Sequence, residues 1–235
     1  MKVLEKYLIK LWHEAANYNN QTLTAIIDPA KKARILDIGP FRGDLILKRV
    51  KNIREAEIYA VDNDPEAIKS CKKLGIRVKQ YNVEKGLPYK SNQFDIVSAN
   101  QIIEHLTNID LFVKEIHRVL KPNCYAVLST ENLSSWHNLI AMLLGWQAFS
   151  QQISTLKNIG NPLKFSQEQI IENDRHQTIF TLFGLKSLFE LHGFIIEKSF
   201  GAGYYPLPNP FSEIFSKLDP NHSAFIGIKA RKPSK

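Results

Sequence analysis

The chain has 235 residues, of which 44% are hydrophobic and 23% charged, and its formal net charge is +8. This length and composition predict one α/β domain with additions and exclude an intrinsically disordered protein. No apolar run reaches the roughly 18 residues that a membrane-spanning helix needs, so no transmembrane segment is expected.

The cysteines and the N-terminal segment favour a cytoplasmic protein. Cys71 and Cys124 lie far apart without a C-x-x-C motif, so we expect reduced thiols instead of a disulfide framework or a zinc site. The first residues mix charges early and lack the apolar region of a signal peptide. The basic residues are scattered along the chain, which is typical of solvated surfaces, and nucleic acid is therefore a less expected partner than a small molecule.

The first 30 residues are expected to form a helical cap. Apolar residues recur at helical spacing from residue 2 to about residue 28. The polar run Asn17–Asn20 predicts a break, followed by a second short helix. That helix is expected to end at Asp28, because the residue before a proline is biased away from helix.

The strongest pattern is a strand, a glycine turn, a helix and a second strand. An apolar run leads through Asp37 into Gly39-x-x-x-Gly43, and a second apolar run ends at Asp62, 19 residues after Gly43. An acid at the tip of the second strand suits the two hydroxyls of a ribose, so the unit predicts a nucleoside-bearing cofactor at the carboxyl edge of a parallel sheet. The glycine spacing differs from G-x-G-x-x-G, which disfavours a nicotinamide-dependent oxidoreductase.

Strands and helices are expected to alternate through this part of the chain. Alternation of this kind predicts a parallel sheet covered by helices on both faces. The expected strands lie near 34–38, 57–62, 76–81, 94–99 and 123–130, and the expected helices near 43–51, 65–73 and 108–119.

The pattern changes after residue 130. The apolar segment 134–149 is expected to be a buried helix and loop, with an apolar lid or a membrane-surface patch as the alternatives. The polar segment 150–178 is expected to be a loop that helps to form the substrate entrance. A helix over 180–192, ended by Gly193, and strands over 194–200 and 224–230 complete the chain.

Several motifs resemble those of the class I S-adenosylmethionine-dependent methyltransferases. Asp37, Gly39 and Gly43 match that family's first motif, D-x-G-x-G-x-G, while Phe41 stands in place of the middle glycine. A bulky residue is costly wherever φ must be positive, and Phe41 therefore raises the alternative of a cofactor-binding or partner protein without catalysis. The other motifs follow in the family's order: Asp62, segments 80–89 and 94–100, Ile103–Leu106 and the turn Val119–Asn123.

The resemblance implies a Rossmann-like, doubly wound α/β fold. Its sheet has about seven strands, mostly parallel with an antiparallel last strand, and helices on both faces. The implied cofactor is S-adenosylmethionine and its product S-adenosylhomocysteine. We expect a single methyltransferase domain over 1–235, divided into a helical cap (1–30), a cofactor-binding core (31–130), a lid or substrate insertion (131–180) and a C-terminal helix with closing strands (181–235).

The resemblance also assigns cofactor binding to residues at the strand ends. The two glycines let the backbone approach the methionine part, whose amino group Asp37 orients. Asp62 accepts the ribose hydroxyls, the pair at 82–83 faces the adenine, and the residue at the end of the fourth strand meets the methionine end. The assigned residues are Asp37, Gly39, Gly43, Asp62, Asn63, Asn82, Val83 and Asn100.

His105 is the candidate catalytic base. It lies just beyond the fourth strand, and histidine takes up a proton near neutral pH; the alternative is that it braces the following helix. The pair Glu104–His105 is similar to one in an RNA 3′-end ribose methyltransferase family, which has a further glutamate where Gln101 stands here. One carboxylate and one histidine make a thin site for a hard cation, so no metal is expected.

The expected activity is methyl transfer to an oxygen or nitrogen of a small acceptor. The apolar segment 134–149 and Tyr204–Pro208 favour a partly apolar acceptor. An RNA ribose methyltransferase is the alternative that the net charge and Glu104–His105 favour. Methylation of adenine N6 is disfavoured, because Asn100–Ile103 lacks the [DN]-P-P-[YF] motif. The sequence carries no indication of the oligomeric state.

Overall fold

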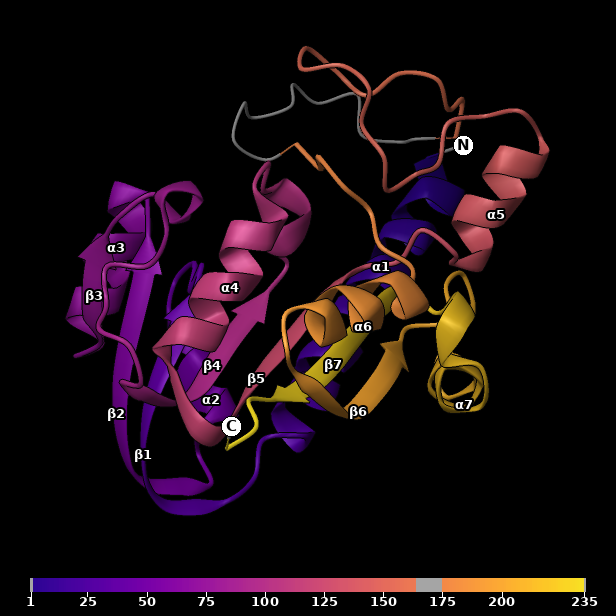
Figure 1. Cartoon of the computed structure of the whole chain (residues 1–235). Helices are drawn as coiled ribbons and strands as arrows, with labels where there is room; N and C mark the ends of the chain where they lie inside the picture. The colour runs from indigo at the N-terminus through magenta and orange to yellow at the C-terminus, as the bar shows by residue number, and fades with distance from the viewer. Residues whose placement is uncertain (1, 164–174, 235) are drawn as a thin grey trace.

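A single seven-stranded sheet forms the centre of the protein (Figure 1). The structure is a computed structural model that describes residues 2–163 and 175–234. The strand order is β3-β2-β1-β4-β5-β7-β6; β1 to β5 pair in parallel, and β7 is antiparallel to both neighbours. The predicted α/β sheet with an antiparallel last strand is confirmed. The strands are β1 Ala30–Ile38, β2 Ile53–Asp62, β3 Arg77–Gln80, β4 Phe94–Asn100, β5 Leu120–Glu131, β6 Ile195–Ala202 and β7 Phe225–Arg231.

Helices cover both faces of the sheet. Ile35 and Leu36 lie in different apolar clusters, because successive side chains of a strand point to opposite faces. Leu36 packs with residues of α4 and α6, whereas Ile35 packs with residues of α1, α2 and α3. The described helices are α1 Lys2–Ala25, α2 Asp44–Arg49, α3 Pro65–Lys73, α4 Ile109–Val119, α5 Trp136–Leu143, α6 Leu182–Leu191 and α7 Phe211–Leu218, with 3₁₀ turns η1 Val83–Lys85, η2 Ile103–His105 and η4 Pro220–His222.

Helix α1 is continuous over 24 residues, so the predicted break at Asn17–Asn20 is wrong. Asn19 is buried, and its side-chain amide donates to the Asn100 side chain in β4 and to the Ser129 hydroxyl in β5. Asn20 donates to the Ala16 carbonyl oxygen one turn earlier. The polar run therefore attaches the helix to the sheet instead of ending it.

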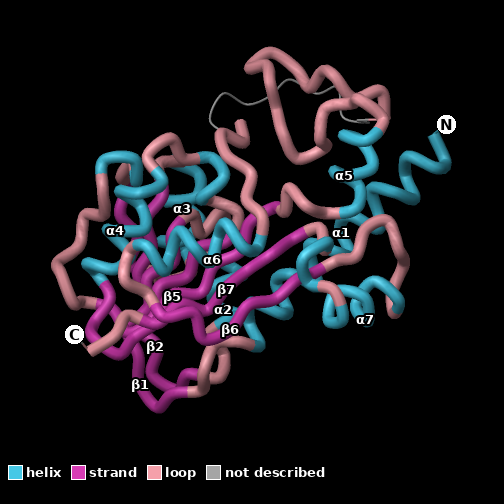
Figure 2. The backbone as a smooth tube through the Cα atoms, turned by 45° about the vertical axis from the view of Figure 1, so that its right-hand side comes forward, coloured by secondary structure: helices cyan, strands magenta, loops and turns pink. Residues whose placement is uncertain are grey.

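The apolar segment that follows β5 is far more exposed than expected. Leu143 is 85% exposed and Ile140 51%, so the prediction of a buried helix is wrong for most of the apolar side chains of α5. The buried side of α5 is polar: the Asn138 amide donates to the Asn132 carbonyl oxygen and to the Ser150 hydroxyl. The tube in Figure 2 shows α5 beside the N-terminal part of α1, with the loop that follows α5 above them. Residues 164–174, part of the expected substrate entrance, lie outside the described residues.

The C-terminal strands pair as expected, but their connection contains a helix that was not predicted. Helix α7 lies between β6 and β7 in the chain and buries two serines, Ser212 and Ser216, while Phe211 and Leu218 are exposed. A buried face of small polar residues gives a weak periodic signal, which explains the omission. None of the described helices is long and apolar enough to cross a bilayer.

Candidate functional site

A cavity of ≈1030 Å³ opens at the carboxyl ends of the parallel strands. Its wall includes the last residues of three adjacent strands: Ile38 from β1, Asp62 from β2 and Asn100 from β4. The chain order reverses between β1 and β4, and ligands of open α/β sheets bind at this switch point. Of the residues assigned to the cofactor, Gly39, Asp62, Asn63, Asn82, Val83 and Asn100 line the cavity, as does His105, whereas Asp37 and Gly43 do not.

The glycine loop after β1 requires both of its glycines. Gly39 has φ +67°, and a Cβ atom there would lie 2.0 Å from Ile102 Cδ1. Gly43 has φ +81°, and its Cβ would lie 2.9 Å from Ile76 Cδ1. The Gly43 N–H donates to the Pro40 carbonyl oxygen at 2.8 Å and closes the turn. Gly43 therefore shapes the loop from behind the cavity wall, while Gly39 allows the Ile102 side chain to pack directly against the loop.

Phe41 has the positive φ that its place in the loop requires, at +53°. Its ring is 63% exposed and lies 5.3 Å from the Arg42 guanidinium carbon. The bulky side chain thus projects from the turn instead of filling it. The positive φ costs Phe41 conformational energy that glycine would not pay, as expected for a residue with a Cβ atom.

Asp62 lies at the tip of β2 on the cavity wall. Its carboxylate accepts a hydrogen bond from the Asp64 N–H at 3.0 Å. Burial raises the pKa of Asp62, and contacts with the N–H groups of Asp64, Asn63 and Phe41 oppose that rise. The acid is therefore held by its own loop and by the glycine loop, facing the cavity from the strand end.

The segment after β3 forms the neighbouring part of the wall. The Asn82 side chain accepts from the Glu84 N–H and starts η1. The Glu84 carboxylate accepts from the Thr107 N–H at 2.7 Å, the Thr107 hydroxyl at 3.0 Å and the Asn108 N–H at 3.1 Å. These bonds join two loops that are 23 residues apart and fix Asn82 and Val83 on the wall.

A buried polar network lies behind the wall. Asp37 is 2% exposed, and its carboxylate lies 3.4 Å from the Arg49 guanidinium, which is also buried. Arg49 donates further bonds to the Ser98 hydroxyl and to the Asn20 side chain in α1. Burial raises the pKa of Asp37 to about 6, although Arg49 and Ser98 act to lower it. Asp37 is thus placed to act on the cavity through its neighbours instead of by direct contact.

Asn100 connects this network to the cavity. Its side-chain oxygen accepts from the Asn19 amide at 3.1 Å and from the Ser129 hydroxyl at 2.5 Å. Its amide donates to the Asn20 oxygen at 3.3 Å. The sequence analysis missed Asn19, Asn20, Arg49 and Ser129, and the one signal for them was the asparagine run inside an amphipathic helix.

The part of the cavity around His105 brings together residues that are far apart in sequence. His105 lines it together with Arg175 and Gln177. The His105 and His176 ring centroids are 4.9 Å apart, and His105 Nδ1 lies 3.3 Å from the Arg175 carbonyl oxygen. Glu104 is fully buried, and burial raises its pKa to about 7. Sequence reasoning missed His176 as a neighbour of His105 because 71 residues separate them.

His137 does not share this position. It is packed among the rings of Trp12, Tyr205 and Phe149, and burial lowers its pKa to about 3. It does not line the cavity. A neutral histidine in an aromatic cluster has a packing role.

Comparison with known proteins supports one family. Residues 36–128 match the family model described as a methyltransferase domain. The chain is 26% identical over 194 residues to the mitochondrial ubiquinone biosynthesis O-methyltransferase of Rattus norvegicus. The matched region covers 78% of this chain and 49% of the relative. It is 30% identical over 118 residues to the ubiquinone biosynthesis O-methyltransferase of Bradyrhizobium diazoefficiens. That matched region covers 48% of this chain and 45% of the relative. The chain spans about half the length of the curated relatives it matches.

The whole fold has solved counterparts. A crystal structure of an S-adenosylmethionine-dependent methyltransferase from Thermotoga maritima matches with a TM-score of 0.65 and 17% identity, over 98% of this chain and 95% of that chain. At this identity the match supports the fold, including the helices and strands that lie outside residues 36–128.

Proposed function

We propose that this chain, which carries a class I S-adenosylmethionine-dependent methyltransferase domain, methylates an oxygen or nitrogen of a small, partly apolar acceptor. The resemblance found in the sequence is confirmed by the matched domain and the fold, and both imply S-adenosylmethionine as the cofactor. The observation that carries the proposal is the cavity at the strand ends, with Asp62 on one wall and Asn100 and His105 on another.

The residues of the cavity fit this cofactor. A half-buried carboxylate at a strand tip suits vicinal ribose hydroxyls, and Asp62 supplies it. Gly39 lines the cavity without a side chain, and the Ile102 side chain packs directly against it where a Cβ atom would clash. The Asn82–Val83 wall offers an apolar and an amide surface for a purine, and Asn100 offers its amide at the methionine end.

The bound cofactor supplies an activated methyl group for an in-line displacement, and the protein supplies position and a desolvated site. Asp62 binds and orients the nucleoside, while Asn100, held by Asn19 and Ser129, fixes the other end of the cavity. His105 lies on the acceptor side, next to Arg175 and Gln177. The reaction needs the acceptor's proton to leave as the new bond to carbon forms.

Oxygen is the better supported acceptor atom. The rat and bradyrhizobial relatives are named as O-methyltransferases. A partly apolar acceptor also suits the exposed apolar side chains of α5, among them Ile140 and Leu143, which follow the carboxyl end of β5. We propose that the protein works in a reducing compartment such as the cytoplasm, because its two cysteines are free.

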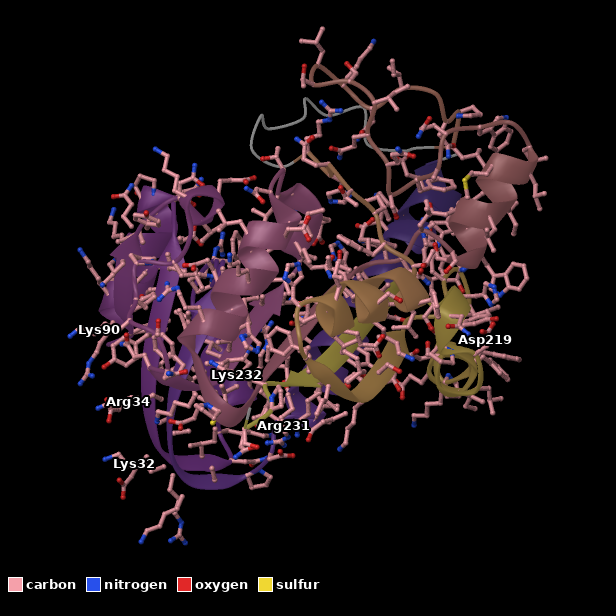
Figure 3. All side chains as sticks on the ribbon, viewed as in Figure 1. Lys32, Arg34, Lys90, Asp219, Arg231 and Lys232 are labelled. Atoms are coloured by element: carbon pink, nitrogen blue, oxygen red, sulfur yellow. The ribbon has the colours of Figure 1, made fainter. Side chains whose placement is uncertain are left out.

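RNA as the acceptor is less well supported. Figure 3 shows Lys32, Arg34, Arg231 and Lys232 on the lower side of the molecule, away from the carboxyl ends of the parallel strands. Arg34 is ion-paired with Glu57, and Arg231 with Glu197. A positive surface that bound a phosphate backbone would be needed beside the cavity.

Calorimetric titration with S-adenosylmethionine and S-adenosylhomocysteine tests the proposal. We expect micromolar binding of both, and Asp62→Asn weakens it by roughly 10- to 100-fold, because hydrogen bonds to a charged group contribute about 1.5–3 kcal/mol. Asparagine can still accept the Asp64 N–H, so the turn is retained.

Glu66→Gln is the matched control, since Glu66 is an exposed acid in the first turn of α3 and does not line the cavity. Equal binding by wild type and Asp62→Asn would contradict the assignment of Asp62. If wild type binds neither ligand, the reading as a protein without catalysis replaces the proposal.

A further inference from the structure

Three metal-ligating side chains converge at the acceptor side of the cavity. Glu104, His105 and His176 each offer one ligand atom, and these atoms all lie within 4.8 Å of one another. Glu104 and His105 belong to η2, directly after β4, and His176 comes from the far side of the acceptor region. The N–H groups of Gln177 and Thr178 donate to the Glu104 carbonyl oxygen at 2.6 and 3.2 Å, which holds the His176 segment against η2.

The buried Glu104 carboxylate lacks hydrogen bonds of ordinary geometry in the described part of the chain. Its side chain is fully buried, and neither carboxylate oxygen has a hydrogen-bond partner in the described part of the chain. The nearby Thr130 hydroxyl in β5 opposes the rise in the pKa of Glu104, but it forms no hydrogen bond of ordinary geometry with the carboxylate. A buried carboxylate without hydrogen bonds is costly, and proteins meet that cost by pairing the charge or by coordinating a metal.

The charges around Glu104 favour a divalent ion. A second acid, Glu131, places Oε2 3.7 Å from His176 Nδ1. Among the described residues, no lysine or arginine forms an ion pair with Glu104 or Glu131. Two acids in one buried corner are balanced by a dication more completely than by one protonated histidine.

Both histidines face backbone carbonyl groups through Nδ1. His176 Nδ1 lies 2.7 Å from the Ser150 carbonyl oxygen, and His105 Nδ1 lies 3.3 Å from the Arg175 carbonyl oxygen. Donation from Nδ1–H to a carbonyl selects the tautomer whose lone pair is on Nε2. Metal-binding histidines are oriented in the same way by a carbonyl or carboxylate behind the ring.

We propose that Glu104, His105 and His176 bind a divalent transition-metal ion, and that this ion holds the acceptor's oxygen beside the cofactor cavity. The second half rests on the proposed function, whereas the first does not. Two imidazoles and one carboxylate favour Mn²⁺, Fe²⁺ or Zn²⁺ over Mg²⁺, which prefers oxygen ligands. Ligand atoms about 2.1 Å from one ion are about 3.0–3.5 Å apart when they are neighbours in its coordination sphere, so the three side chains need to approach one another by up to about 1.8 Å.

The proposal changes the expected role of His105 and the expectation that no metal is bound. The sequence showed only two ligands, and the third becomes visible through the fold. His105 would then act as a ligand instead of a general base. The ion would lower the pKa of the acceptor hydroxyl bound to it, so that the hydroxyl gives its proton to solvent water and its oxygen takes the methyl group as the bond from that carbon to the cofactor's sulfur breaks. Three protein ligands leave coordination positions open, which suits an acceptor with a hydroxyl and an adjacent second oxygen.

Binding of Mn²⁺ to chelator-treated full-length protein tests the site without any assay of activity. The electron paramagnetic resonance signal of free Mn²⁺ is lost on binding, and titration gives the affinity and stoichiometry. We expect one ion per chain, at least tenfold weaker binding in Glu104→Gln and His176→Ala, and weaker binding of Mg²⁺ than of Mn²⁺. His13→Ala is the matched control, because His13 is exposed on α1 and far from the cluster in sequence.

Circular dichroism and cofactor titration on the same preparations separate the two proposals. Glu104→Gln removes a charge without changing size, so it is expected to fold and to retain cofactor binding. Asp62→Asn is expected to lose cofactor affinity and keep Mn²⁺ affinity. The metal site is overturned if wild type leaves the Mn²⁺ signal unchanged at millimolar concentration, or if folded Glu104→Gln and His176→Ala bind Mn²⁺ as tightly as wild type.

Discussion

The cofactor side and the acceptor side of the cavity are built in different ways. On the cofactor side, Gly39, Asp62 and Asn100 each end or follow a strand, and the parallel sheet brings them together. On the acceptor side, Glu104 and His176 come from distant parts of the chain and meet through loop packing. A topology shared by many sequences therefore determines the first side, and contacts particular to this chain determine the second.

The largest effect on stability is expected in the buried polar network behind the cavity wall. Arg49 contacts Asp37 in β1, Ser98 in β4 and Asn20 in α1. Arg49→Met leaves the buried Asp37 carboxylate unpaired, and removal of one partner of a buried ion pair costs about 3–5 kcal/mol. The free energy of unfolding from urea titration should fall by that amount.

Two further variants make this experiment specific. Lys48→Met changes the exposed neighbour of Arg49 and should shift the unfolding free energy by less than about 0.5 kcal/mol. The double change Arg49→Met with Asp37→Asn should recover part of the loss, because no buried charge is then left unpaired. If Arg49→Met is as stable as Lys48→Met, the Asp37–Arg49 pair does not hold this network together.

The sequence was sufficient for the parts of the fold that depend on local signals. The helix α3 was predicted at 65–73 and lies there, with Pro65 in its first turn and Asp64 as its N-cap. Asn123 ends the turn expected at Val119–Asn123, and its φ of +61° is in the left-handed region that asparagine tolerates. These features depend on a few consecutive residues, so a single sequence contains the information.

Long-range contacts account for the parts that were not predicted. The asparagine run in α1 suggested a break, because nothing in the sequence shows that Asn19 bonds to Asn100 and Ser129. The apolar residues of α5 suggested burial, yet its buried face is the polar one with Asn138. His176 was unremarkable until the fold placed it beside His105. For Asn19 and His176 the deciding partner is more than 70 residues away, and Asn138 also reaches Ser150, 12 residues further along the chain.

In the glycine loop, the cost of backbone strain can be separated from the cost of a steric clash with a distant residue. Gly39→Ala and Gly75→Ala both place a Cβ on a residue with positive φ, at +67° and +75°. At Gly75 nothing lies within 4 Å of the new atom, whereas at Gly39 it lies 2.0 Å from Ile102 Cδ1. Backbone strain alone costs roughly 1–2 kcal/mol, and overpacking adds about 1–3 kcal/mol at Gly39.

Two measurements distinguish these contributions. Urea unfolding should show Gly39→Ala to be the less stable variant by the overpacking amount. Cofactor titration should show weaker binding only for Gly39→Ala, because Ile102 lines the cavity and must move. Equal losses in the two variants would mean that strain in the turn, and not the approach of Ile102, is what the glycine relieves.

The smallest effect is expected at the contact by which α1 reaches the cofactor side. Asn19→Ala removes the donor that holds Asn100, and a hydrogen bond contributes about 1 kcal/mol, so cofactor affinity should fall by about fivefold. Asn17→Ala is the control, since Asn17 is exposed two residues earlier and gains the same helix propensity. Calorimetric titration of the two variants compares a change that reaches Asn100 with one that does not. If both bind the cofactor like wild type, α1 only covers the sheet; a loss confined to Asn19→Ala means that a helix outside the matched domain determines how tightly the cofactor end of the cavity is held.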